Sequence, residues 1–294
     1  MINRVERPRV KSFVERKNEE AELLQKKEQQ IKQQLTTIKN NQKFSKVINI
    51  SLITLENLIS KDNSEHLINI KLIIKLNGIK ILCNITSVNS ENEEIIDKAT
   101  MLLKNLIKND NKKTFELSKI FLEKNGQNDI FQLLISLKND KGIYNLLEII
   151  YILIPIPQFF NILMESEMID TIKFLIEFNF NKIHITNLLN KIIAKITNHK
   201  KGRDLLINDE FVKKIRENIE KNIQEQNQEP IIDELIILDN ILKNDNGKIY
   251  SCHQIQRLIT IEDAIFDWIL RYGCPSLRSR GSNAQNNQYR DRSH

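Results

Sequence analysis

The stretch "LKNLIKND", residues 103–110, decides the fold because near-copies of it occur at two distant places in the chain. "LENLISKD" begins at residue 55 and "LDNILKND" begins at residue 238. Each copy places Asn two residues after a Leu, continues with two apolar residues, and ends in an Asp that is followed by Asn. Recurrence of one phrase at wide, regular intervals indicates an internal structural repeat.

The spacing of the phrase predicts the architecture. Two weaker cognates, "IYILIPIP" and "IAKITNHK", fill the long interval between the second and third copies, and the first apolar residues of the five phrases are then 48, 47, 43 and 45 positions apart. Stacked helical repeats have periods of about 40 to 47 residues. We therefore expect an all-α chain, a right-handed α-solenoid of about five repeats over residues 44–270. The five marker residues are Leu55, Leu103, Ile150, Ile193 and Leu238.

Within one period the pattern predicts two short helices and one long helix. In "NKKTFELSKIFLEKNGQNDIFQLLISL" one helix ends near Gly126 and a second carries Ile130 and Phe131, and Asn77-Gly78 marks the same junction one period earlier. We expect each glycine to adopt the left-handed conformation that ends a helix. The Asp-Asn after each phrase predicts a cap for the next helix, at Asn63, Asn111 and Asn246 or at the Asp before each.

The repeat resembles the armadillo (HEAT-like) family, in which a third helix ends in Ala-x-x-x-Leu-x-Asn-Leu. "KATMLLKNLI", with Ala99, Leu103 and Asn105, carries the resemblance, which extends over roughly residues 45–250. In that family the Asn lines a concave groove and binds the backbone of an extended peptide. The resemblance therefore implies a ladder of groove residues at Asn57, Asn105 and Asn240, which is interrupted at Ile152 and at Lys195, a further polar candidate of the groove.

The family's nuclear-import receptors also carry a Trp four residues before that Asn. The matching positions here hold Ile53, Met101 and Ile236. This departure argues against a nuclear-import role.

Residues 1–43 are expected to form a basic arm followed by one long charged helix, because residues 10–42 contain no Gly or Pro. An imperfect apolar stripe with 3-4 spacing follows this helix and is interrupted by Lys17 and Glu28. Two interpretations stay open: the helix folds back on the repeats, or it lies along another protein. The stripe consists of Val10, Val14, Ala21, Leu24, Ile31, Leu35 and Ile38.

Positive charge is concentrated at both ends of the chain, whose net charge is +6. Residues 1–17 and residues 271–294 each carry +4, so the remaining body carries −2. Because the planar guanidinium group binds carboxylates in a bidentate manner, clustered Arg predicts tails that dock on acidic partner proteins. The tail residues singled out for this role are Arg4, Arg7, Arg9, Arg16, Arg278, Arg280, Arg290 and Arg292.

Cysteine usage and hydropathy predict a cytoplasmic protein. The three cysteines form no CxxC pair, which suggests a reducing compartment, and the N-terminus lacks the apolar core of a secretory signal. The apolar stretch 146–164 contains Glu148, Pro155 and Pro157, and it is expected to form two buried helices rather than a membrane span.

Sequence motifs for catalysis are absent. The chain has no GxGxxG, GxxxxGK[ST], HExxH or GxSxG motif, and its five His have no metal-ligand spacing, so no enzyme, metal or cofactor is expected. Nucleic-acid binding is disfavoured because the body has few Arg and no recognition motif. The expected function is a non-enzymatic scaffold within a multi-subunit assembly, in a cytoskeletal, ciliary or microtubule-associated setting. The alternative is a module that clamps an extended peptide in its groove.

Overall fold

A computed structural model describes residues 13–60, 65–108, 111–165, 167–178 and 182–206, together with residues 213–215, 217–219, 221, 233–234, 236–237 and 240. All regular structure in these residues is helical, which confirms the all-α prediction. The helices are α1 (Phe13–Asn40), α2 (Ser45–Ile59), α3 (His66–Lys75), α4 (Gly78–Val88), α5 (Glu93–Ile107), α6 (Asn111–Glu123), α7 (Gly126–Ser136), α8 (Asp140–Leu153), α9 (Pro157–Glu165), α10 (Met168–Phe178), α11 (Ile183–Thr197) and α12 (Lys200–Leu206).

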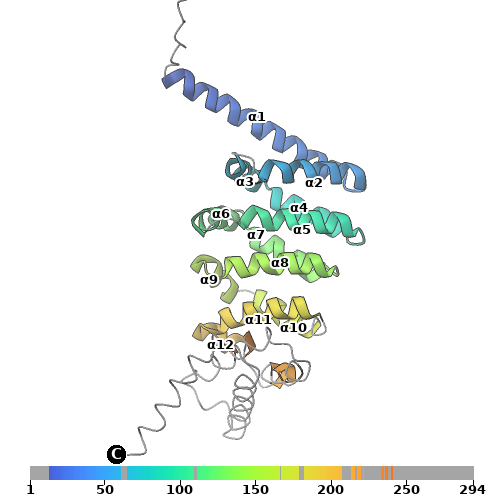
Figure 1. Ribbon diagram of the computed structural model, residues 1–294, viewed down its shortest axis with the longest axis vertical. Coiled ribbons are helices and arrows are strands. Elements are labelled where there is room, and N and C mark those ends of the chain that lie inside the picture. Colours follow the sequence, from blue (N-terminus) through green and yellow to red (C-terminus); the bar gives the residue numbers. More distant parts are fainter. Residues whose placement is uncertain are drawn as a thin grey trace, which may run out of the picture.

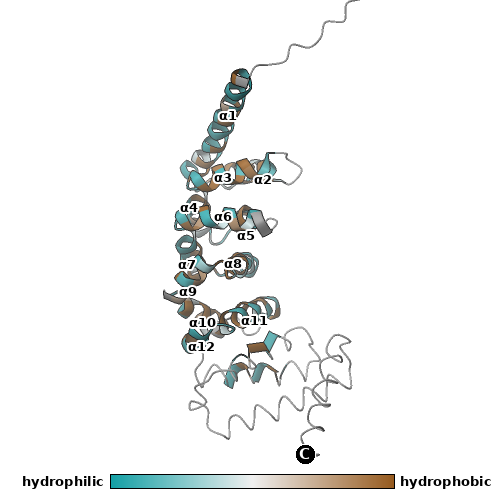
Figure 2. Cartoon of the chain, turned by 90° about the vertical axis from the view of Figure 1, so that its left-hand side faces the viewer, coloured by the Kyte–Doolittle hydropathy of each residue, from teal (hydrophilic) through white to brown (hydrophobic). Residues whose placement is uncertain are grey.

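The helices are arranged in layers that follow one another along the longest axis of the molecule (Figure 1). Helices three places apart in the chain pack together, so that α2, α5, α8 and α11 form one column of long helices. A second column contains α4, α7 and α10, and it lies on the opposite side of the stack (Figure 2). Each layer therefore repeats the arrangement of the layer before it.

The four long helices share one sequence register. Counted from the first residue of each helix, the marker residues Leu55, Leu103, Ile150 and Ile193 all occupy the eleventh position. All four side chains are buried, and they belong to a single hydrophobic core that continues through the layers. The period read from the sequence thus coincides with the spacing of equivalent core positions.

Side-chain hydrogen bonds connect each layer to the next at the same interval. Asn92 contacts Ser45, Asn145 contacts Thr100, and Lys195 contacts Tyr151. These pairs are 47, 45 and 44 residues apart, which matches the repeat period. The layers are therefore joined by polar contacts as well as by apolar burial.

The short helices meet at tight junctions whose geometry differs from the prediction. Asn77 and Asn125 have φ angles of 60° and 55°, so the left-handed residue is the Asn and not the Gly that follows it. Gly78 and Gly126 begin the next helices, and each lies against the preceding helix. A Cβ on Gly78 would lie 2.7 Å from the carbonyl oxygen of Ile73, and one on Gly126 would lie 2.6 Å from the ring of Phe121. Close packing, rather than a positive φ, requires glycine here.

Helix capping differs from the prediction at α3. The residue before α3 is Glu65 rather than Asp62 or Asn63, and it makes no side-chain cap. Asn111 is the first residue of α6, and the alternative cap Asp110 lies outside the described residues together with Asp245 and Asn246, so these caps stay predictions. Asparagine instead caps two long helices: Asn92 accepts from the Ile95 amide at 3.2 Å, and Asn139 accepts from the Gly142 amide at 2.8 Å.

The apolar stretch 146–164 forms the end of α8 and most of α9, as predicted. The two helices bend by 115° at the break between them, and Pro157 is the first residue of α9, where its missing N–H is tolerated. Within the described part of the chain, no single helix is both long and apolar enough to cross a membrane, although α8 and α9 taken together as a bent pair pass that test.

Candidate protein-interaction surfaces

Four of the groove-ladder positions occupy equivalent places on the long-helix column. Asn57, Asn105, Ile152 and Lys195 are the thirteenth residues of α2, α5, α8 and α11, counted from each helix start. Asn57 is exposed and the other three are half-buried. The structure thus brings these residues into one row along the stack.

The first two ladder residues have their amide groups available. No contact within the described residues engages the side chain of Asn57 or Asn105, although backbone Asn57 O accepts from Ser60 N at 3.4 Å. Two unengaged amides one layer apart offer donors and acceptors to an extended backbone.

Asn240 does not belong with them. Its side chain is 4% exposed, and its amide donates to Ala194 O at 3.1 Å and to Thr197 Oγ1 at 3.2 Å. The donor groups that a peptide would need are turned toward α11. The assignment of Asn240 to the ladder is therefore corrected: its amide joins two layers, where a buried donor must find an acceptor.

The interruption of the ladder coincides with an apolar hollow. Phe115, Tyr151, Ile152, Pro155 and Ile156 line a pocket of about 520 Å³, together with Lys108, Thr114 and Lys195. The ammonium group of Lys195 lies 3.5 Å from the centre of the Tyr151 ring, within cation–π range. At Ile152, where the ladder lacks an Asn, the surface therefore has an apolar hollow that two lysines, Lys108 and Lys195, also line.

A polar cluster beneath the ladder joins α5 to α8. Lys104 Nζ contacts Glu148 Oε2 at 2.8 Å and Asn145 Oδ1 at 2.9 Å, and Lys108 Nζ lies 3.4 Å from Glu148 Oε1. Burial raises the pKa of the Glu148 carboxyl, but the hydrogen bonds and charges of the two lysines outweigh burial and hold that pKa below its ordinary value. Glu148 is therefore ionised at neutral pH and anchors both lysines.

Helix α1 folds back on the repeats over part of its length, and the alternative that it lies along another protein stays a prediction for the rest. Its C-terminal part folds back on the repeats, since Ile31, Leu35 and Ile38 are buried against neighbouring helices. Residues 14–26 are all exposed, and this half extends beyond the other helices (Figure 1). The stripe continues into this half, where Val14 and Leu24 are 64% and 45% exposed. We call residues 14–26 the arm.

The predicted docking arginines lie almost entirely outside the described residues. Arg16 is exposed on the arm. The remaining ones, for which the docking prediction stays untested, are Arg4, Arg7, Arg9, Arg278, Arg280, Arg290 and Arg292.

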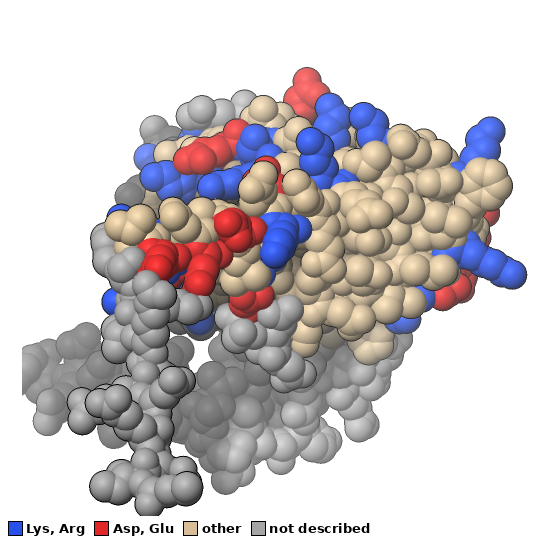
Figure 3. All heavy atoms as spheres, turned by 90° about the horizontal axis from the view of Figure 1, so that it is seen from above, with Lys and Arg blue, Asp and Glu red and all other residues tan. Residues whose placement is uncertain are grey.

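Charge is unevenly distributed at the α1 end of the stack. Viewed from that end, Lys, Arg, Asp and Glu lie mostly on one side and along the opposite edge, and a broad area between them shows no charged side chain (Figure 3). In the first layer Phe44, which precedes α2, is 64% exposed, and Ile50 and Ile53 of α2 are 66% and 43% exposed.

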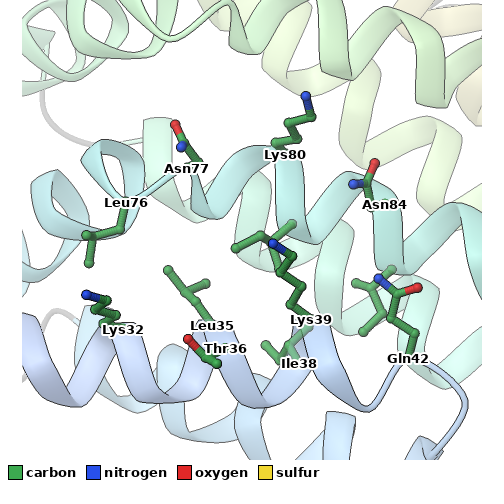
Figure 4. Close-up of a pocket in the computed structure, with 12 residues that line it drawn as sticks. Lys32, Leu35, Thr36, Ile38, Lys39, Gln42, Leu76, Asn77, Lys80 and Asn84 are labelled. Atoms are coloured by element: carbon green, nitrogen blue, oxygen red, sulfur yellow. The ribbon is translucent and has the colours of Figure 1, made fainter.

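A cleft between α1 and α4 is a surface that the sequence patterns did not single out (Figure 4). It has a volume of about 360 Å³, an apolar floor and three lysines. Two of the lysines, Lys32 and Lys39, are seven residues apart and therefore share one face of α1. That spacing was readable in the sequence, but Lys80 joins them only through folding. The lining residues are Lys32, Leu35, Thr36, Ile38, Lys39, Gln42, Leu76, Asn77, Lys80, Ile81, Asn84 and Ile85.

Neither a metal-binding cluster nor a similarity to known proteins assigns a function to this chain. No group of three His, Cys, Asp or Glu side chains that could hold a metal ion occurs in the described ranges. No protein-family model, curated protein or solved structure matches the chain.

Proposed function

We propose that this chain is a non-enzymatic scaffold, a right-handed α-solenoid of about five armadillo-like repeats that is held in a larger protein assembly by its helical arm and basic tails. The observation that carries the proposal is the arm, which exposes an apolar stripe beyond the body of the protein.

The repeat interpretation draws support from register and spacing. Four long helices place their marker residues at the same position, and the hydrogen bonds between layers join residues one period apart. Repeat proteins have this property, because each repeat contacts only its neighbours along the chain.

The arm leaves apolar side chains without burial. It is the exposed half of the 28-residue helix α1, so its stripe is covered by no other part of the described chain. Its stripe places Val14, Ala21 and Leu24 on the face that buries Ile31, Leu35 and Ile38 further along α1. A partner helix laid along the arm would continue the same apolar seam.

The setting of the assembly is part of the proposal. Basic tails favour a partner with an acidic surface, and a cytoplasmic filament such as the microtubule, in the cytoskeleton or a cilium, has that chemistry.

The experiment compares two neighbouring leucines of the arm. Leu24→Glu places a charge in the stripe, whereas Leu23→Glu, at a site that is equally exposed but off the stripe, is the matched control. We expect Leu24→Glu to release the protein from the assembly in a co-sedimentation assay, and Leu23→Glu to be retained. Equal retention of both variants would contradict the role of the arm.

The tails are tested separately. A chain lacking residues 1–12 and 271–294, which keeps all of α1, should sediment with the assembly less than the full chain does, and the difference should shrink as salt rises. Unchanged retention at moderate salt would remove the tails from the proposal.

A second candidate function is favoured by the row of Asn57 and Asn105. The chain would clamp an extended segment of a partner along the long-helix column, with an apolar side chain in the hollow at Tyr151. Asn57→Ala with Asn105→Ala should weaken partner binding and leave thermal unfolding unchanged. Asn240→Ala is the contrast, because losing its buried hydrogen bonds should lower stability. If the double variant binds as well as the unaltered chain, the clamp is excluded.

A further inference from the structure

We propose that the cleft between α1 and α4 is a docking site for a short acidic segment of a partner protein, one that places an apolar side chain between two carboxylates. The cleft lies at the second column, away from the row of Asn57 and Asn105 (Figure 2). The inference is therefore independent of both candidate functions above.

Charge is the first argument. The lining contains Lys32, Lys39 and Lys80 and no Asp or Glu. All three lysines are exposed, and no ion pair among the described residues engages them. Asp129 lies close enough for Lys80 to lower its pKa, although burial raises that pKa more strongly. Lys32 and Lys39 therefore offer the charge that a partner carboxylate can use most freely.

Shape and polarity are the second argument. The floor is apolar and is formed by buried Leu35, Ile38 and Ile85 with half-buried Ile81. Figure 4 shows Lys32 and Lys39 rising from α1 toward α4, whereas Asn77, Lys80 and Asn84 lie at the α4 edge with their polar ends directed away from α1. A small inorganic anion gains nothing from an apolar floor, whereas an acidic segment that carries one apolar side chain matches both parts.

Dimensions define the segment. Seven residues separate Lys32 from Lys39, about 10 Å along a helix. Carboxylates on the same face of an extended chain are two or four residues apart, about 7 or 13 Å, so side chains four positions apart can reach both lysines with an apolar side chain midway between them. A cavity of about 360 Å³ is at the small end for ligand pockets, so it holds one or two side chains and not a whole helix.

The binding test uses fluorescein-labelled peptides of twelve residues on the full chain. Each peptide carries two Glu four positions apart, with Leu, Ile or Phe midway between them, so that all three side chains share one face of an extended peptide. One control peptide has Gln in place of both Glu, and another has Ser in place of the apolar residue. We expect the acidic apolar peptides to bind in fluorescence anisotropy, and both control peptides to bind more weakly. Failure of every acidic apolar peptide to bind would overturn the proposal.

Two variants of equal net charge show whether the peptide binds at the cleft. Lys32→Glu, Lys39→Glu and Lys80→Glu together should weaken binding by about tenfold or more. The control reverses three exposed lysines elsewhere, Lys75, Lys124 and Lys191, and keeps the same net charge. Equal loss in both variants, or no loss in the cleft variant, would show general attraction or binding by the basic tails, and either outcome overturns the proposal.

Two further measurements distinguish an acidic partner segment from other occupants of the cleft. The first adds inorganic phosphate, with chloride at equal ionic strength as the control. If phosphate displaces the peptide and chloride does not, the cleft is a small-anion site, which contradicts the proposal. A photo-crosslinking residue at exposed Asn84 should join the peptide. A crosslink within the chain that the peptide fails to suppress would identify an intramolecular occupant and would likewise overturn it.

Discussion

At the residue scale, two residues, an Asn and the Gly that follows it, determine each junction between the short helices. At each junction an Asn takes the left-handed conformation and the following Gly touches the preceding helix. The two residues therefore have separate roles: the Asn turns the chain, and the Gly permits close approach.

Substitutions at one junction should separate these roles. Gly78→Ala is expected to destabilise the fold by about 1 to 3 kcal/mol, because the added methyl group overlaps the carbonyl of Ile73. Asn77→Gly should change stability by no more than about 0.5 kcal/mol, since glycine adopts a positive φ without strain. Urea unfolding of both variants measures this difference. Equal stability of the two would show that the contact at Gly78 relaxes freely.

Glu148 should make stability depend on pH. Its pKa in the folded protein is lowered from the ordinary value of 4.5, so its ionised form stabilises the fold above that value. This contribution is lost as pH falls through the folded-state pKa. We expect Glu148→Gln to lose about 1 to 3 kcal/mol at pH 7, where Lys104 and Lys108 lose a charged partner.

The same variant and the unaltered chain should approach equal stability in acid. Glu94→Gln is a suitable control, because Glu94 pairs with Lys98 on the surface of α5, where ion pairs contribute little. Thermal unfolding of the three proteins between pH 3 and pH 7 checks the pattern. A gap at Glu148 that stays constant with pH would assign its role to packing instead of charge.

At the scale of elements, α1 is one helix with two environments. Leu35 is 2% exposed against the body, whereas Leu24, eleven residues earlier on the same stripe, is 45% exposed. The boundary lies near Lys27, which is 9% exposed and forms an ion pair with Glu65.

The two leucines should respond differently to truncation. Leu35→Ala is expected to destabilise the chain by about 2 to 5 kcal/mol, because it leaves a cavity against the neighbouring helices. Leu24→Ala should leave the unfolding midpoint of the isolated chain unchanged. Chemical denaturation followed by circular dichroism distinguishes them. A comparable loss at Leu24 would mean that the arm is buried in the free protein.

The elements were largely readable from the sequence, and the surfaces were not. Buried apolar residues at fixed spacing predicted the long helices, and the paired Asn-Gly predicted the short-helix junctions. Asn240 matched the pattern of a groove residue, yet a pattern does not show that its donor has found Ala194. The cleft was not predicted from the sequence because Lys80 belongs to a different helix than Lys32 and Lys39, and only packing brings the two helices together.

At the scale of the whole molecule, the proposed repeat predicts that one complete layer can be removed. Deleting residues 108–154 removes one full period and joins the end of α5 to the start of the α9 layer. Because each layer contacts only its neighbours, we expect a shorter chain that stays helical and unfolds cooperatively at a lower temperature.

A deletion out of register is the control. Removing residues 126–148 takes away about half a period and brings unlike helices together. Circular dichroism and thermal unfolding should then show loss of helix and of cooperativity. If both deletions behave alike, the layers are not equivalent.

The hydrogen bonds that join layers 40 to 47 residues apart also bear on how the chain forms during synthesis. These contacts never require a distant end of the protein, so the cost of closing chain loops stays the same at each step. Each new layer can settle on the one already made as soon as one more period has left the ribosome. The arm and the first layers would then be in place, with the partner surface of α1 already presented, before the last residues are translated.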